Sequence, residues 1–140
     1  MSRGIEARAL EDAPTGAVPT NRTVLVVEDD RVIATLVQHL LERRGYAVEV
    51  VPDGRAAVDR LASDPPGLVV LDVMLPFVDG FELIERIRGT ASWRDVPIVM
   101  LTVRSQERHV VRALEAGAND YMIKPFKPGE LAARIRRFLP

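Results

Sequence analysis

Cysteine is absent from this chain of 140 residues. Its absence excludes disulfide bridges, thiolate zinc sites and thiol nucleophiles, and it suits a reducing compartment. Aromatic residues make up only 5% of the chain, and no apolar run approaches the roughly 20 residues that span a bilayer. The formal net charge of -1 gives no overall attraction to nucleic acid or to an anionic membrane. We therefore expect a cytoplasmic protein that binds neither a membrane nor, directly, nucleic acid.

The first 22 residues differ from the rest of the chain. They mix both charge signs, contain turn-forming proline and glycine, and lack the continuous apolar stretch of a secretory signal. We expect residues 1–22 to form a flexible tail. The remaining residues, 23–140, have the right length for one compact domain with a single core.

From residue 23 onward, short aliphatic runs alternate with longer amphipathic segments. This alternation is typical of βαβ units in a parallel sheet. Glu49 interrupts one of the aliphatic runs, which places that strand at an edge of the sheet. The pattern predicts strands at 23–28, 46–51, 68–72, 97–102 and 120–124, and helices at 31–44, 54–63, 80–88, 105–116 and 128–139.

Polar side chains gather where the predicted strands end. Right-handed crossovers bring the carboxyl ends of parallel strands to one edge of a sheet, which is where ligands of open α/β sheets bind. If the first and third strands are neighbours, three carboxylates converge there and repel one another. A magnesium ion, which prefers oxygen ligands, would offset that repulsion. The residues at these strand ends are Glu28, Asp29, Asp72, Thr102 and Lys124.

Acids, a metal ion and a lysine together suit a phosphoryl group, whose charge spreads over three oxygens during transfer. Asp72 ends a predicted buried strand and precedes a loop, so we interpret it as a nucleophile that forms an aspartyl phosphate. Thr102 would donate a hydrogen bond to the transferred group.

Each of these residues also has a purely structural explanation. Asp72 could serve as a turn or cap residue, and Glu28 and Asp29 could merely favour the positive end of the next helix. We assign Asp30 to that structural role, as the N-cap of the first helix. The occurrence of five polar residues along one edge nevertheless favours a functional site.

Four segments resemble the signatures of the receiver domain of bacterial two-component response regulators, in the family's order and spacing. The resemblance implies a flavodoxin-like, doubly wound α/β fold, with five parallel strands in the order 2-1-3-4-5 and five helices. It also implies a cis peptide bond between Lys124 and Pro125. The segments are "VLVVEDD", "LVVLDVMLPFVDGFEL", "VPIVMLTV" and "GANDYMIKPF".

The same resemblance implies a phosphorylation-activated signalling switch rather than an enzyme. Asp72 would accept a phosphoryl group from a histidine kinase or a phosphotransfer protein, and the domain would assist its own phosphorylation and autodephosphorylation. Mg²⁺ would be bound directly by Asp29 and Asp72, through water by Glu28, and by the backbone carbonyl of Met74.

Thr102 and Lys124 match the family's phosphoryl-binding pair, and Thr102 and Tyr121 match its switch positions. By this resemblance, phosphorylation would reshape the surface formed by residues 105–116, 120–124 and 128–139. That surface would control a downstream protein target or a C-terminal output domain missing from this segment, and it is the place to expect a homodimer.

Two residues depart from the family pattern. Val103 stands where a small residue is usual, which predicts slower phosphorylation. Phe77 stands where related loops have glycine, which predicts a stiffer and more apolar loop after Asp72.

Three other functions remain open. A phosphatase of the haloacid dehalogenase type would need a second acid two residues after its nucleophile, where this chain has Met74. A nucleotide or flavin module would need a glycine-rich phosphate loop, and no GxxxxGK[ST] occurs. A degenerate receiver would bind partners without being phosphorylated.

Overall fold

A computed structural model describes residues 21–103 and 107–140 of the chain. It contains a sheet of five parallel strands in the order β2-β1-β3-β4-β5. The predicted fold class and strand order are confirmed, whereas residues 1–20 of the predicted tail lie outside the described ranges. The strands are β1 (Thr23–Val27), β2 (Ala47–Val51), β3 (Leu68–Asp72), β4 (Ile98–Thr102) and β5 (Asp120–Ile123).

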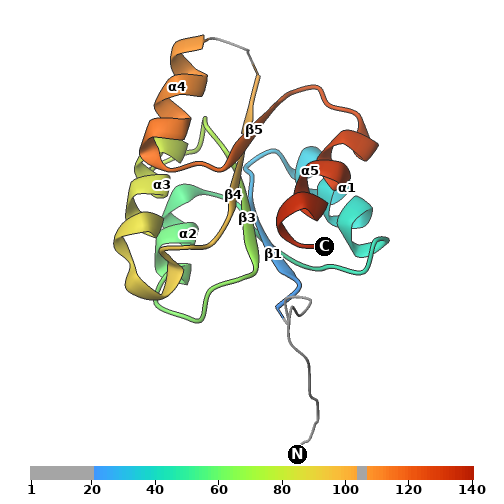
Figure 1. The fold of residues 1–140 in the computed structure, drawn as a ribbon, viewed down its shortest axis with the longest axis horizontal. Helices are drawn as coiled ribbons and strands as arrows, with labels where there is room; N and C mark the ends of the chain where they lie inside the picture. The colour runs from blue at the N-terminus through green and yellow to red at the C-terminus, as the bar shows by residue number, and fades with distance from the viewer. Residues whose placement is uncertain (1–20, 104–106) are drawn as a thin grey trace, which may run out of the picture.

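Helices cover both faces of this sheet (Figure 1). Helices α1 and α5 lie over one face, and α2, α3 and α4 lie over the other. Each face has its own apolar core between sheet and helices. No helix within the described residues combines the length and apolar character needed to cross a membrane. The helices are α1 (Arg31–Glu42), α2 (Gly54–Arg60), α3 (Gly80–Gly89), the one-turn 3₁₀ helix η1 (Ala91–Trp93), α4 (Glu107–Ala116) and α5 (Pro128–Phe138).

The burial of the strands follows from their positions in the sheet. Every residue of the central strands β3 and β4 is buried, as expected for strands between two layers of helices. Strand β2 lies at an edge, which confirms the prediction made from Glu49. The Glu49 carboxylate pairs with the Arg60 guanidinium of α2, with 2.8 Å between Oε2 and Nε.

The helix boundaries agree with the predicted ones to within a few residues, except that the predicted start of the fourth helix, residue 105, lies outside the described residues. Asp30 caps α1 as predicted, because its Oδ1 accepts hydrogen bonds from the backbone N–H groups of Val32 and Ile33. Helix α2 is three residues shorter than predicted. The N–H groups of residues 61–63 bond to carbonyls three residues earlier, so the last turn tightens before the two prolines that follow.

Arg88 of α3 joins three segments on the α3 and α4 side of the sheet. Its guanidinium donates hydrogen bonds of 2.7 Å to the carbonyl oxygens of Arg94, Val96 and Gly117, and one of 2.8 Å to the side-chain oxygen of Asn119. Burial lowers the pKa of Arg88. Gly117 directly follows α4, so this arginine fastens the C-terminal end of α4 to α3.

Candidate functional site

The register of the sheet brings the carboxyl ends of the strands level with one another. Val27 of β1 pairs with Leu71 of β3, and Thr102 of β4 pairs with Ile123 of β5. The residues at or just after these positions therefore lie along one edge of the sheet. They are the polar residues singled out in the sequence: Glu28, Asp29, Asp72, Thr102 and Lys124.

Three acids form a cluster at this edge. Glu28, Asp29 and Asp72 each place a carboxylate oxygen within 4.8 Å of the others. Glu28 is 2% exposed and Asp72 6% exposed, whereas Asp29 is exposed to solvent. The donors are all carboxylate oxygens, which is the chemistry that a hard cation such as Mg²⁺ prefers. The cluster thus fits the predicted metal site, with Asp29 on its open side.

Lys124 lies between two of these acids. Its Nζ is 2.7 Å from Oε1 of Glu28 and 2.9 Å from Oδ2 of Asp72. The sequence placed Lys124 at the site but did not predict that one ammonium group pairs with both acids at once. Only the reach of the side chain from β5 across to β1 and β3 could have indicated it.

The three charged groups shift one another's proton affinities. Burial raises the pKa of Glu28 from 4.5 to about 7, although the hydrogen bond from Lys124 opposes this shift. Burial would lower the pKa of Lys124, but its hydrogen bonds to Glu28 and Asp72 outweigh that effect and the pKa is raised. Lys124 is therefore a firmly protonated cation beside the two buried carboxyl groups.

The backbone also supports the acids. The N–H of Met74 donates to Oδ1 of Asp72 at 3.1 Å, and the N–H of Asp30 donates to Oε2 of Glu28 at 3.1 Å. A Cβ added to Gly80 would lie 2.6 Å from the carbonyl oxygen of Asp72, so only glycine lets α3 begin this close to β3. The Met74 carbonyl as a metal ligand stays a prediction.

The loop after Asp72 contains an unusual aromatic residue. Phe77 has a φ of 72°, a left-handed backbone conformation that is rare for residues with a side chain. The residue is 67% exposed, and the Arg55 guanidinium carbon lies 3.9 Å from the ring centroid. The loop after Asp72 therefore presents an apolar surface to solvent, as predicted, whereas its stiffness stays a prediction.

The remaining predicted residues lie close to the acids or on the neighbouring strand. Thr102 is buried at the end of β4, and its carbonyl accepts a 2.6 Å hydrogen bond from the N–H of Lys124. Tyr121 is partly buried and packs against the core on the α3 and α4 side. The peptide bond between Lys124 and Pro125 is cis, as predicted. The switch roles of Thr102 and Tyr121 stay predictions.

Comparison with known proteins matches this arrangement to a family. The model of the response regulator receiver domain matches residues 24–136, which span all five strands. The chain belongs to this family. A receiver domain is a signalling domain of two-component systems, and in this one the three acids and Lys124 meet at the carboxyl edge of the sheet.

Similar proteins include regulators and isolated receiver domains. The response regulator MprA of Mycolicibacterium vanbaalenii is 47% identical over 116 residues, which are 83% of this chain and 49% of MprA. The alkaline phosphatase synthesis transcriptional regulatory protein PhoP of Bacillus subtilis is 44% identical over 119 residues, 85% of this chain and 49% of PhoP. The chain thus spans about half the length of these curated relatives.

A solved structure shares the fold. The receiver domain of the sensor histidine kinase PA1611 from Pseudomonas aeruginosa is 34% identical, with a TM-score of 0.79 over 86% of this chain and 98% of that domain. That structure has a magnesium ion coordinated in its active site cleft.

Proposed function

We propose that this domain is a phosphorylation-controlled switch in which Asp72 accepts a phosphoryl group from a histidine kinase or a phosphotransfer protein. The observation that carries the proposal is the set of contacts around Asp72: two further acids within 4.8 Å and the Lys124 ammonium at 2.9 Å. A buried carboxylate with this much charge around it fits a nucleophile toward an anionic group better than a turn residue.

The residues of the site would divide the work of transfer. Asp29 and Asp72 would hold Mg²⁺ directly, with Glu28 acting through water and the Met74 carbonyl completing the ligands. When bound, Mg²⁺ would neutralise charge on the phosphoryl oxygens. Oδ2 of Asp72, which pairs with Lys124 before the reaction, attacks phosphorus as the bond between phosphorus and the donor's imidazole nitrogen breaks. The Lys124 ammonium gives up its contact with Oδ2 of Asp72 and binds an oxygen of the incoming phosphoryl group instead.

The surface beside Lys124 supports docking of a protein donor. Leu36 and Val103 are large apolar side chains that remain exposed. They border an apolar cavity of about 280 Å³ that opens next to the Lys124 side chain, and a donor helix could fill it while presenting its histidine to Asp72. The cavity is lined by Ile33, Leu36, Val103, Lys124, Pro125 and Phe126.

The output surface would lie on the far side of Lys124. Thr102 would move toward the bound phosphoryl group and Tyr121 would turn inward, which would reshape α4, β5 and α5. On this surface Asp120 pairs with Arg134 at 3.0 Å and with Arg137 at 3.5 Å, while Val111 and Leu114 of α4 are exposed. We propose that this surface binds a second copy of the domain, a downstream protein or an output domain. In a regulator such as PhoP, the output domain would come from the half that this chain does not match.

The experiment that tests the proposal is incubation with acetyl phosphate and Mg²⁺, followed by intact-protein mass spectrometry. We expect one added phosphoryl group on the wild-type chain and none on Asp72→Asn, because the amide is not a nucleophile of this kind. Omission of Mg²⁺ should prevent the addition. A product that forms without Mg²⁺, or on Asp72→Asn, would contradict the proposal. Steady turnover of p-nitrophenyl phosphate would favour the phosphatase instead.

Val103 provides a second prediction at this site. Its side chain is 61% exposed and directly follows Thr102, so it narrows the approach to the phosphoryl position. We expect Val103→Ala to react faster with acetyl phosphate, by up to about tenfold, which corresponds to roughly 1.4 kcal/mol off the barrier. The rate is followed by mass spectrometry, with Val111→Ala on α4 as the matched control. Equal rates for Val103→Ala and wild type would contradict the prediction that Val103 slows phosphorylation.

A further inference from the structure

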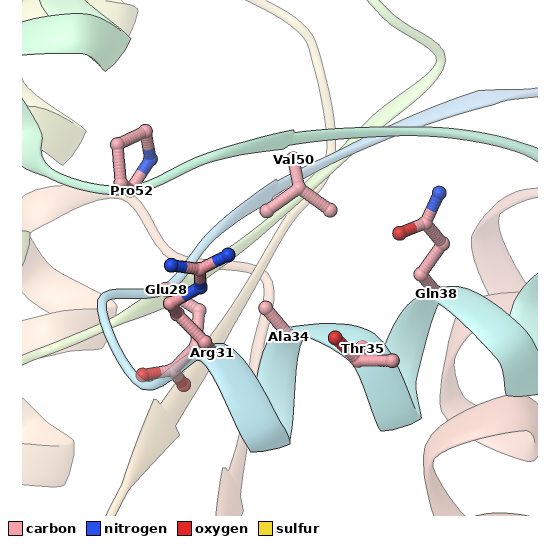
Figure 2. A pocket seen from close by; sticks show the side chains of 7 residues that line it. All are labelled: Glu28, Arg31, Ala34, Thr35, Gln38, Val50 and Pro52. Atoms are coloured by element: carbon pink, nitrogen blue, oxygen red, sulfur yellow. The ribbon is translucent and has the colours of Figure 1, made fainter.

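A second cavity lies between α1 and the edge strand β2 (Figure 2). Its volume is about 340 Å³, at the small end of ligand-binding pockets. Three polar side chains, Arg31, Thr35 and Gln38, project from one face of α1 at a spacing of four and three residues. Val50 projects from β2 toward the helix. Small and apolar residues complete the wall, and the lining as a whole is Glu28, Arg31, Ala34, Thr35, Gln38, Val50 and Pro52.

Arg31 brings to this cavity a positive charge that pairs with no acid in the described part of the chain. Among residues 21–103 and 107–140, no ion pair or hydrogen bond engages its guanidinium. The residue is exposed at the first position of α1, a turn that contains no acid. The N-cap carboxylate of Asp30 accepts hydrogen bonds from the N–H groups of Val32 and Ile33 and not from the Arg31 guanidinium. An anion bound beside Arg31 would therefore give the guanidinium a charged partner.

The neighbouring acid does not fill this role. Both carboxylate oxygens of Glu28 are engaged elsewhere, Oε1 with the Lys124 ammonium at 2.7 Å and Oε2 with the N–H of Asp30 at 3.1 Å. Glu28 therefore lines the cavity, but its carboxylate is paired with Lys124, beside Asp72. Its proximity also disfavours a doubly charged ligand, because the second negative charge would face an acid instead of a second cation.

The remaining lining residues indicate what else a ligand would contain. Val50, Ala34 and Pro52 offer an apolar floor suited to a short aliphatic chain. The Thr35 hydroxyl can donate a hydrogen bond to a ligand carboxylate oxygen. The Gln38 amide nitrogen already donates to Glu42 at 3.2 Å, so Gln38 offers only its carbonyl oxygen, which can accept from a ligand hydroxyl but not from a carboxylate.

We propose that the cavity between α1 and β2 binds a small aliphatic monocarboxylate, with the carboxylate on Arg31 and the chain on Val50 and Ala34. The site is separate from the phosphoryl position at Asp72 and shares only the Glu28 wall with it. Its occupation requires neither Mg²⁺ nor phosphorylation, so it stands or falls independently of the function proposed above.

The test is a ¹H–¹⁵N NMR titration of the metal-free domain with sodium butyrate, compared with sodium chloride at equal ionic strength. We expect saturable shifts confined to residues 31–38 and 50–52, with a Kd on the order of 1 to 10 mM for so small a ligand. Arg31→Gln should weaken binding at least about tenfold. Thr35→Val should weaken it about threefold.

The matched control is Arg136→Gln, which removes another exposed arginine, on α5, and should leave the butyrate affinity unchanged. Shifts that equal those of sodium chloride, or that persist in Arg31→Gln, would overturn the site. Tighter binding of inorganic phosphate than of butyrate at the same residues would overturn the assigned ligand class.

Discussion

Lys124→Met lowers the free energy of unfolding of the metal-free domain by about 3 to 5 kcal/mol, the usual cost of removing one partner from a buried ion pair. The lysine ammonium lies within 2.9 Å of both Glu28 and Asp72, and all three side chains are at least nine-tenths buried. Without the ammonium group, two buried acids face each other with no cation between them. Either one of the two acids takes up a proton, or the edge of the sheet that holds them unfolds.

This loss should shrink when Mg²⁺ is present, because a divalent ion bound by the same acids replaces the missing positive charge. Urea denaturation at pH 7, with and without saturating Mg²⁺, measures both quantities. Lys127→Met is the matched control, since Lys127 is exposed and makes no side-chain hydrogen bond at the start of α5, and it should change stability by less than about 0.5 kcal/mol. An equal loss for Lys124→Met with and without Mg²⁺ would show that the ion and the lysine do not share the acids.

The metal-free domain should lose stability as the pH rises from about 4.5 to about 7, because folding favours the protonated form of Glu28 and this proton is lost over that range. Its pKa in the folded state is raised to about 7, mainly by burial, above the value of 4.5 for a free carboxyl group. The folded state therefore holds this proton more tightly than the unfolded state. The stabilisation is complete below pH 4.5 and is lost as the pH passes 7, a change of up to about 3 kcal/mol.

The measurement is the free energy of unfolding of wild type minus that of Glu28→Gln at several pH values, which cancels the groups common to both proteins. The difference should fall as the pH rises in metal-free buffer. In saturating Mg²⁺ the trend should reverse, because the ion binds the carboxylate and not the acid. A difference that stays flat from pH 4.5 to 8 would mean that Glu28 has the same pKa in the folded and the unfolded domain, which would contradict the prediction.

The arrangement of the site was predictable because it depends on position along the strands. Alternating aliphatic and amphipathic runs predict the parallel sheet, and parallel strands necessarily bring residues such as Asp72 and Thr102 to one edge. The edge position of β2 followed from a single charge, Glu49. Each of these predictions uses information within a few residues of the position concerned.

Other features could not be read from local patterns. Lys124 pairs with Glu28, 96 residues away, only because its side chain crosses two strands of the finished sheet. The guanidinium groups of Arg88 and Arg55 likewise find their partners through tertiary contacts with Gly117 and Phe77. The cavity beside Arg31 depends on how far α1 stands from β2, a distance that hydrophobic periodicity does not specify.

The bonds from Arg88 to Gly117, the residue directly after α4, have a mechanical consequence. They fasten one end of a helix roughly 15 Å long, whose other end, at Glu107, follows Thr102 by five residues in the sequence. If α4 moves, it would therefore rotate about its end at Gly117, so that its first turn would be displaced most and its last turn least.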